Sequence, residues 1–184
     1  SIYTKEIRSF LSSLAGYVVL LVFLIATGLL LWVLPETNIL PNANILDYGY
    51  ASLEQFFAIA PVVLMFLIPA ITMKMFADEY KSGTIEWLMT KPLSSFQILT
   101  GKYWAAFTLA IIGLVPTLIY LFSINWLAIE GGALDAGGIT GSYIALILLV
   151  GCFTSIGIFA SSLTDNQIVS FLIALVLCFG LYSG

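Results

Sequence analysis

Five apolar runs are the feature that most constrains how this chain can fold. A helix that crosses a lipid bilayer needs about 20 consecutive apolar residues. The runs cover residues 14–34, 56–76, 104–126, 143–163 and 168–183, and the last is the shortest. Only 9% of the residues are charged, whereas a soluble domain carries roughly a quarter. We therefore predict an all-α, polytopic membrane protein that forms one transmembrane domain over residues 1–184.

The basic residues indicate how these spans are oriented. Lys5 and Arg8 precede the first run, and the other four basic residues lie in or beside the segment between the second and third runs: Lys74, Lys81, Lys91 and Lys102. The gaps at residues 35–55 and 127–142 contain acidic residues but no Lys or Arg. Because Lys and Arg near span ends stay on the cytoplasmic side, we expect the N terminus and residues 77–95 to face the cytoplasm.

Several classes of function are disfavoured by composition. The chain has no His and only two Cys, Cys152 and Cys178, both inside apolar runs, so an imidazole ligand, a proton relay and a Ser/His pair are excluded and a metal site is not expected. The net charge of −4 argues against nucleic acid as a partner. A membrane enzyme that acts on lipid is disfavoured as well, because no carboxylates cluster at a predicted interface.

The first 13 residues predict an amphipathic helix. Tyr3, Ile7, Phe10 and Leu11 recur at helical spacing, and the polar residues occupy the other face. Such a helix lies in the bilayer interface. One interpretation is that this helix sets the orientation of the first span. The other is that it acts as a lever that joins this span to movements in the cytoplasm. The two roles are compatible.

Residues 77–95 form a polar segment that predicts a short helix between two breaks. Ser82 or Thr84 can cap a helix over Thr84–Met89, and Gly83 permits a tight turn before it. The pair Lys91-Pro92 ends this helix, because proline disfavours a helical predecessor. A capping box, Ser94 with Gln97, then starts the next helix. The apolar residues Ile85, Leu88 and Met89, with Glu86 beside them, would form a docking ridge.

Within the apolar runs, prolines and small residues predict kinks and close packing. Pro61, Pro69 and Pro116 permit kinks in moving helices, although proline is also simply common in spanning helices. A face of small residues marks the fourth run as a packing surface: Gly151, Ser155, Gly157 and Ser161.

The polar segment resembles the first cytoplasmic loop of the ABC-2 type transporter permeases. The matching residues occur in the family's order: Glu79, Gly83-Thr84, Glu86, Leu88-Met89, Pro92 and Gly101-Lys102. The stretches KEIRSF, FADEYKSGTIEWLMTKPLS and GKYWAAF are most similar to the gliding-motility permease subgroup. That family usually has six spans and two cytoplasmic termini, so we expect a further span that this sequence does not include.

The resemblance implies a coupling helix that contacts a cytoplasmic ABC ATPase, in a bacterial inner membrane protein with a cytoplasmic N terminus. The implied contact residues are Glu79, Gly83, Thr84, Glu86, Leu88, Lys91 and Pro92. It also implies a second permease chain, identical or different, a possible periplasmic or membrane-anchored accessory subunit, and residues 1–13 as the family's interfacial helix.

ATP and magnesium are expected in the partner ATPase, and no cofactor is expected in this chain. Gly101-Lys102 is followed by Tyr103 and lacks the upstream glycine of a Walker A sequence. The chain is therefore predicted to be the membrane subunit of an exporter or motility-linked complex and not an enzyme itself. The alternative is an inner-membrane scaffold of a motility or secretion machine that moves no substrate.

Overall fold

The computed structural model describes residues 2–32, 53–89, 94–127 and 136–184, and these residues form helices without strands. In chain order the elements are α1 (Ile2–Ser12), α2 (Leu14–Trp32), α3 (Glu54–Thr72), α4 (Ala77–Lys81), α5 (Thr84–Met89), α6 (Ser95–Leu114), the 3-10 turn η2 (Val115–Thr117), α7 (Leu118–Leu127), α8 (Ala136–Ser162) and α9 (Gln167–Ser183). The predicted all-α membrane fold is confirmed.

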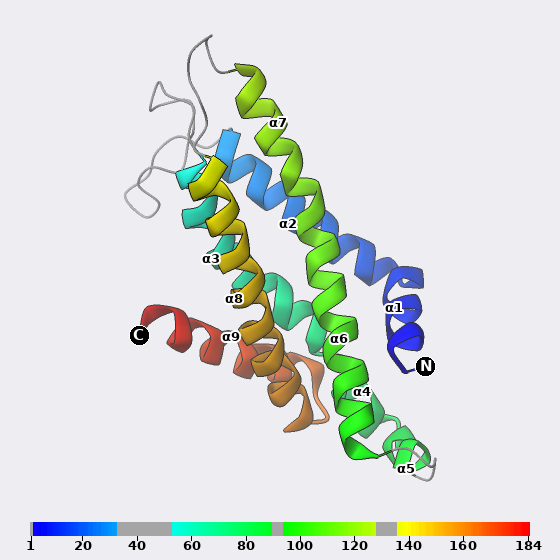
Figure 1. Ribbon diagram of the computed structural model, residues 1–184. Coiled ribbons are helices and arrows are strands. Elements are labelled where there is room, and N and C mark those ends of the chain that lie inside the picture. Colours follow the sequence, from blue (N-terminus) through cyan, green and yellow to red (C-terminus); the bar gives the residue numbers. More distant parts are fainter. Residues whose placement is uncertain (1, 33–52, 90–93, 128–135) are drawn as a thin grey trace.

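Three helical segments in the described residues are long and apolar enough to cross a membrane. They are Glu54–Lys81, Ser95–Ile124 and Gly137–Ser162, and the bent pair α1 and α2 makes a fourth if it counts as one span. The fifth predicted span corresponds to α9, whose 17 residues reach only ~26 Å, less than the ~30 Å hydrocarbon core. In Figure 1, α9 crosses α8 instead of running back along it.

A sharp bend separates α1 from α2. The two helix axes meet at 71°, and backbone N–H groups of Ser13 and Gly16 bond within the bend, to Phe10 O at 3.1 Å and Ser13 O at 3.0 Å respectively. A Cβ on Gly16 would lie 2.2 Å from Phe10 O, so the bend requires glycine there. The bend lets α1 lie against α6 while α2 leaves toward α3 (Figure 1).

The core is centred on α3, which packs against α2, α6, α8 and α9. Leu64 and Ile68 on α3 are almost completely buried. α8 lies close to α3 at Gly157, where a Cβ would lie 2.2 Å from Thr72 Oγ1. Small residues permit such contacts between helices in a membrane.

The predicted small-residue face of α8 is divided between two neighbours. Gly157 packs on α3, whereas Gly151 meets Tyr103 of α6, whose hydroxyl would lie 3.2 Å from a Cβ on Gly151. Ser155 is exposed. The division arises because α8 contacts both α3 and α6.

The three prolines lie inside the spanning segments. Pro61 and Pro69 lie inside α3, which ends at Thr72. Pro116 lies in η2, between α6 and α7, and these elements together form one long rod (Figure 1). A proline lacks the N–H that an α-helix uses, and a tighter turn accommodates it.

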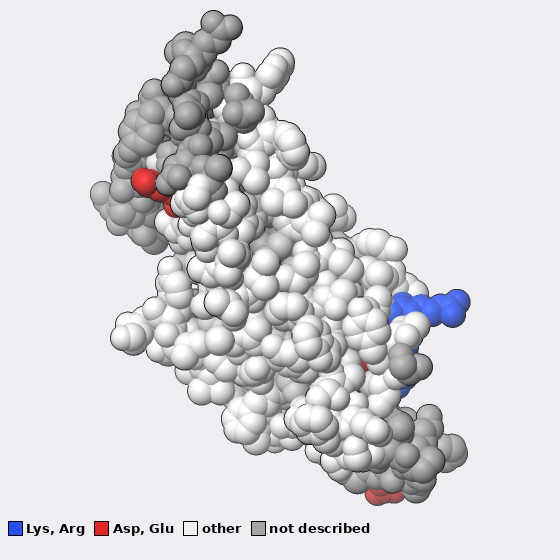
Figure 2. Space-filling model, viewed as in Figure 1, with Lys and Arg blue, Asp and Glu red and all other residues white. Residues whose placement is uncertain are grey.

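On the face drawn in Figure 2, the charged side chains of the described residues lie toward the two ends of the molecule. On this face the described surface between the two ends is uncharged, and the blue Lys and Arg atoms lie at one of them. The same end holds α1, α4, α5, the start of α6 and the turn between α8 and α9 (Figure 1). We refer to it as the basic end.

Candidate functional site at the basic end

The segment between α3 and α6 folds as two short helices joined by a tight turn. Gly83 separates α4 from α5 and has a φ of +68°, a left-handed conformation that costs other L-residues energy. The Ser82 hydroxyl donates to Asp78 O at 2.6 Å and lies 2.9 Å from Thr84 Oγ1. The helix predicted over Thr84–Met89 is present with these bounds.

The start of α6 is also as predicted. Gln97 N donates to Ser94 Oγ, and Ser94 N donates to Gln97 Oε1, both at 3.3 Å. This capping box is confirmed. It satisfies two N–H groups that the first turn of a helix leaves without partners.

The predicted ATPase-contact residues fall into different environments. Thr84 and Glu86 are exposed on α5, and Leu88 belongs to the same helix. Gly83 lies in the exposed turn before it. Lys91 and Pro92 lie outside the described residues.

Glu79 faces inward. Its side chain is 12% exposed, and Lys102 Nζ lies 3.0 Å from its Oε2. Lys5 Nζ lies 3.6 Å from its Oε1. Glu79 therefore binds α4 to α1 and α6, whereas Thr84 and Glu86 remain accessible to a partner.

Lys102 on α6 is the centre of this group and is completely buried. Its Nζ donates to Glu6 Oε1 at 3.3 Å and to the carbonyl of Met75, and it lies 4.7 Å from the ring centroid of Phe76. A buried ammonium is costly unless it is paired and hydrogen-bonded. Lys102 meets this condition only when α1, α4 and α6 are together.

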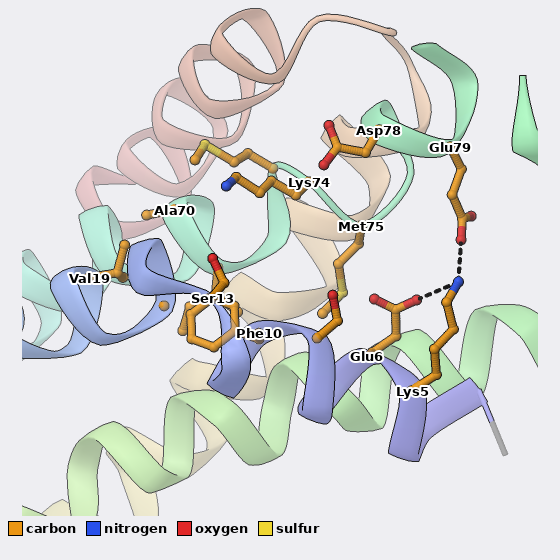
Figure 3. Close-up of a pocket in the computed structure, with 14 residues that line it drawn as sticks. Lys5, Glu6, Phe10, Ser13, Val19, Ala70, Lys74, Met75, Asp78 and Glu79 are labelled. Carbon is orange, nitrogen blue, oxygen red and sulfur yellow. Dashed lines mark ion pairs between the residues drawn. The ribbon is translucent and has the colours of Figure 1, made fainter. Parts of the chain in front are cut away.

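The four side chains Lys5, Glu6, Glu79 and Lys102 form what we call the charge cluster. Figure 3 shows Lys5 reaching from α1 toward both Glu6 and Glu79, and its Nζ is 4.0 Å from Glu6 Oε1. Two ammonium groups thus face two carboxylates, so the cluster is neutral as a whole. Lys5 is mostly exposed, so its pairs contribute little, whereas the pairs of Lys102 are desolvated.

A serine of α8 holds the break between α3 and α4. Ser161 Oγ accepts hydrogen bonds from the N–H groups of Phe76, at 3.0 Å, and Ala77, at 3.2 Å, and donates to Met73 O at 3.2 Å. These backbone groups lie where the regular hydrogen bonding of the helix is interrupted. Because they are buried, they need another hydrogen-bond partner. Ser161 supplies it.

The start of α9 binds α4 as well. Gln167 Nε2 donates to Asp78 Oδ1, and the side chain of Asn166 caps α9 by accepting from Ile168 N at 3.0 Å. Together with the charge cluster and Ser161, this contact attaches α4 to α1, α6, α8 and α9.

The predicted interfacial helix packs on α6 in addition to presenting apolar residues outward. The hydroxyls of Tyr3 and Thr108 are 3.2 Å apart, and Ile7, Phe10 and Leu11 are partly buried against the core. Lys5 of α1 also pairs with Glu79 of α4. The structure therefore brings α1 into contact with α4, although the sequence analysis considers the two segments separately.

Sequence reasoning missed the roles of Lys102, Glu6, Ser161 and Gln167. A signal for Lys102 was present: the capping box at Ser94 places it two turns inside α6 and not in a loop. The sequence analysis uses Lys102 for the orientation of the spans and for the Gly101-Lys102 family match, and neither predicts a buried ion pair. Nothing local in the sequence identifies the partner of Ser161 or Gln167.

The described residues offer no metal site. No three or more Cys, Asp or Glu side chains lie close enough within them to hold a metal ion, and the chain has no His. The arrangement joins α5, which has exposed residues, to α4, which is attached to four other helices.

Comparisons with known proteins identify the family. A search of curated proteins finds no match, and a search of solved structures finds none either. The family model described as ABC-2 family transporter protein matches residues 1–183. This match covers nearly the whole chain, including every element of the basic end. The chain therefore belongs to the ABC-2 transporter family.

Proposed function

We propose that this chain is the permease subunit of an ATP-driven ABC-2 exporter, and that α5 is the contact through which a partner ATPase moves it. Family membership supports the permease role and implies an ABC ATPase partner. The observation that carries the coupling role is the contrast within the α4–α5 segment, where α5 has exposed Thr84 and Glu86 and α4 is held from several sides.

Force applied to α5 reaches the bundle through α4. The turn at Gly83 is tied by the hydrogen bond of Ser82 to the last turn of α4, so α5 and α4 move together over short displacements. The charge cluster, Ser161 and Gln167 then pass the displacement to α1, α6, α8 and α9. Coupling further requires that the ATPase contacts α5 differently before and after ATP hydrolysis.

The proposed orientation places the basic end in the cytoplasm of a bacterial inner membrane protein. The basic residues of the described ranges belong to the elements of this end or to the junction of α3 and α4: Lys5, Arg8, Lys74, Lys81 and Lys102. Positive charges near span ends are retained on the cytoplasmic side. The N terminus and α5 then face the compartment that contains ATP.

The complex that we propose contains two permease chains and two ATPase subunits, with ATP and magnesium bound by the ATPases. The finer assignment to a gliding-motility system rests on the resemblance of KEIRSF, FADEYKSGTIEWLMTKPLS and GKYWAAF. A periplasmic or membrane-anchored accessory subunit would be recovered with the complex if the assignment holds.

The test is copurification from native membranes, followed by ATPase assays of the isolated complex. We expect a cytoplasmic ABC ATPase to copurify and its turnover to be stimulated by the permease. Glu86→Lys reverses an exposed charge on α5, and Leu88→Pro breaks the same helix. Both should lower the stimulation several-fold while membrane insertion is unchanged.

A matched control is Asp165→Lys, which reverses an exposed acidic residue in the turn between α8 and α9 at the same end. It should leave the stimulation unchanged. Recovery of the chain with a motility or secretion assembly but without any ATPase would favour the scaffold alternative. Full stimulation in both α5 variants would refute the coupling role.

A further inference from the structure

A cavity of about 330 Å³ opens at the basic end, between α1 and the junction of α3 and α4. Lys5, Glu6, Ser9 and Ser13 line it from α1, and the opposite wall carries Lys74, Asp78 and Glu79. Figure 3 shows side chains from both walls facing this space. The cavity therefore has charged and polar side chains in its lining, together with apolar ones.

An apolar groove of about 500 Å³ lies along α2 and α3. All of its lining residues are hydrophobic, among them Val22 and Ala26 of α2, Val63 and Phe66 of α3, and Phe171 of α9. Phe66 is 51% exposed and Val22 is 59% exposed, so the groove is open along the side of the molecule.

The cavity and the groove adjoin each other. Val19 of α2 and Ala70 of α3 line both. The groove extends from Val18 to Leu30, which is ~18 Å of helix. One leaflet contributes about 15 Å of hydrocarbon to a bilayer core, so the groove has the length of one lipid acyl chain and its polar end has the position of a headgroup.

The charges of the cavity match a zwitterionic headgroup. Two ammonium groups and three carboxylates line it, and Lys102, paired with Glu6 and Glu79, balances the third carboxylate. Such a neutral site favours a ligand that carries both signs over an anion. Within the described residues Lys74 makes no ion pair, and Figure 3 shows its ammonium extending toward Ala70, where cavity and groove meet.

We propose that the groove and the adjoining cavity together bind one zwitterionic aminophospholipid, with an acyl chain in the groove, the phosphate at Lys74 and the ammonium group at the carboxylates deeper in the cavity. Oδ1 of Asp78 already accepts from Gln167, which leaves Oδ2 for the ligand. The site adjoins the charge cluster. The lipid therefore contacts both α1 and the start of α4.

The proposal does not depend on coupling to an ATPase, and its test measures lipid contact alone. The protein, with any partners that copurify, is reconstituted in phosphatidylcholine nanodiscs that contain a phosphatidylethanolamine with a diazirine in its acyl chain. A phosphatidylglycerol with the same chain is the comparison. Irradiation followed by mass spectrometry locates the adducts.

We expect the phosphatidylethanolamine probe to label residues 18–30 and 62–70 several-fold more than the exposed residues of α7, and more than the phosphatidylglycerol probe does. Lys74→Glu removes the phosphate partner, and Ala26→Trp fills the groove. Each should lower this labelling several-fold. The controls are Lys81→Glu, an exposed lysine outside the cavity, and Ile119→Trp, on the exposed face of α7, and neither should change it.

Equal labelling of the groove and of α7 would mean ordinary annular lipid and would overturn the proposal. Stronger labelling by phosphatidylglycerol would refute the zwitterionic assignment. Adducts that join two copies of the chain at the groove would show that a second protein chain occupies it. Unchanged labelling in both Lys74→Glu and Ala26→Trp would also overturn the proposal. The two changes lie at opposite parts of the site, so if one variant misfolds, the other still tests the proposal.

Discussion

The buried ammonium of Lys102 makes the most specific prediction about stability. Lys102→Met keeps the length and most of the volume of the side chain and removes its charge. The change leaves Glu6 and Glu79, whose side chains are only 15% and 12% exposed, facing each other with Lys5 as their remaining cation. Lys5 is 66% exposed, so solvent screens its attraction.

The expected cost follows from this geometry. Removing one partner of a buried ion pair costs about 3–5 kcal/mol, because the other charge stays buried. Since Lys5 retains part of the compensation, we expect the free energy of unfolding to fall by about 3 kcal/mol, at the lower end of that range. Neutralising Glu79 as well removes one of the stranded carboxylates. The double variant Lys102→Met with Glu79→Gln should therefore lose at least ~1 kcal/mol less than the sum of the single variants.

The measurement is unfolding by sodium dodecyl sulfate in mixed micelles, followed by tryptophan fluorescence. The control is Lys81→Met, which removes an exposed lysine from α4 and should change the free energy by less than ~0.5 kcal/mol. Equal effects of Lys102→Met and Lys81→Met would refute the reasoning, and so would strict additivity in the double variant.

Three further substitutions test other contacts of the fold. Gly157→Ala places a Cβ 2.2 Å from Thr72 Oγ1 and should lower the free energy of unfolding by about 1–3 kcal/mol in the same titration. The control Gly141→Ala has nothing within 4 Å of its Cβ and should not change this free energy. Similar values for the two variants would contradict the close contact of α3 and α8. Ser161→Ala removes the acceptor of two buried N–H groups and should cost about 1–3 kcal/mol, with faster amide hydrogen exchange just after α3; unchanged exchange there would count against this role. Gly83→Ala opposes a φ of +68° and should cost about 1–2 kcal/mol and lower ATPase stimulation; full stimulation would show that α5 does not depend on this turn.

Much of the secondary structure could be read from local patterns. The helix over Thr84–Met89, its glycine turn and the capping box at Ser94 agree with expectation, because each depends on the conformational preferences of a few adjacent residues. The spanning helices follow from apolar length in the same way. The prediction of a span follows less directly from the pattern at α9. Its residues are apolar and helical, but a length of 17 residues does not by itself define a span.

The candidate site could be predicted only in part. The exposed positions on α5 follow from a pattern of charge and turn residues, and the family match supports the class of protein. The inward position of Glu79 could not be predicted, because an exposed and a paired carboxylate look the same in a sequence. The lipid site likewise depends on two walls that come from different parts of the chain.

The sequence by itself determined that this chain is a helical membrane protein with one polar, turn-rich segment between two spans, because hydropathy, helix caps and the left-handed preference of glycine act over a few residues. The tertiary structure alone decided what that segment is attached to. Lys102 and Glu6 are 96 positions apart, and Phe76 and Ser161 are 85 apart. Such pairs form because a charge or a backbone N–H group buried in an apolar bundle must find a partner, and which partner is near depends on how the helices pack.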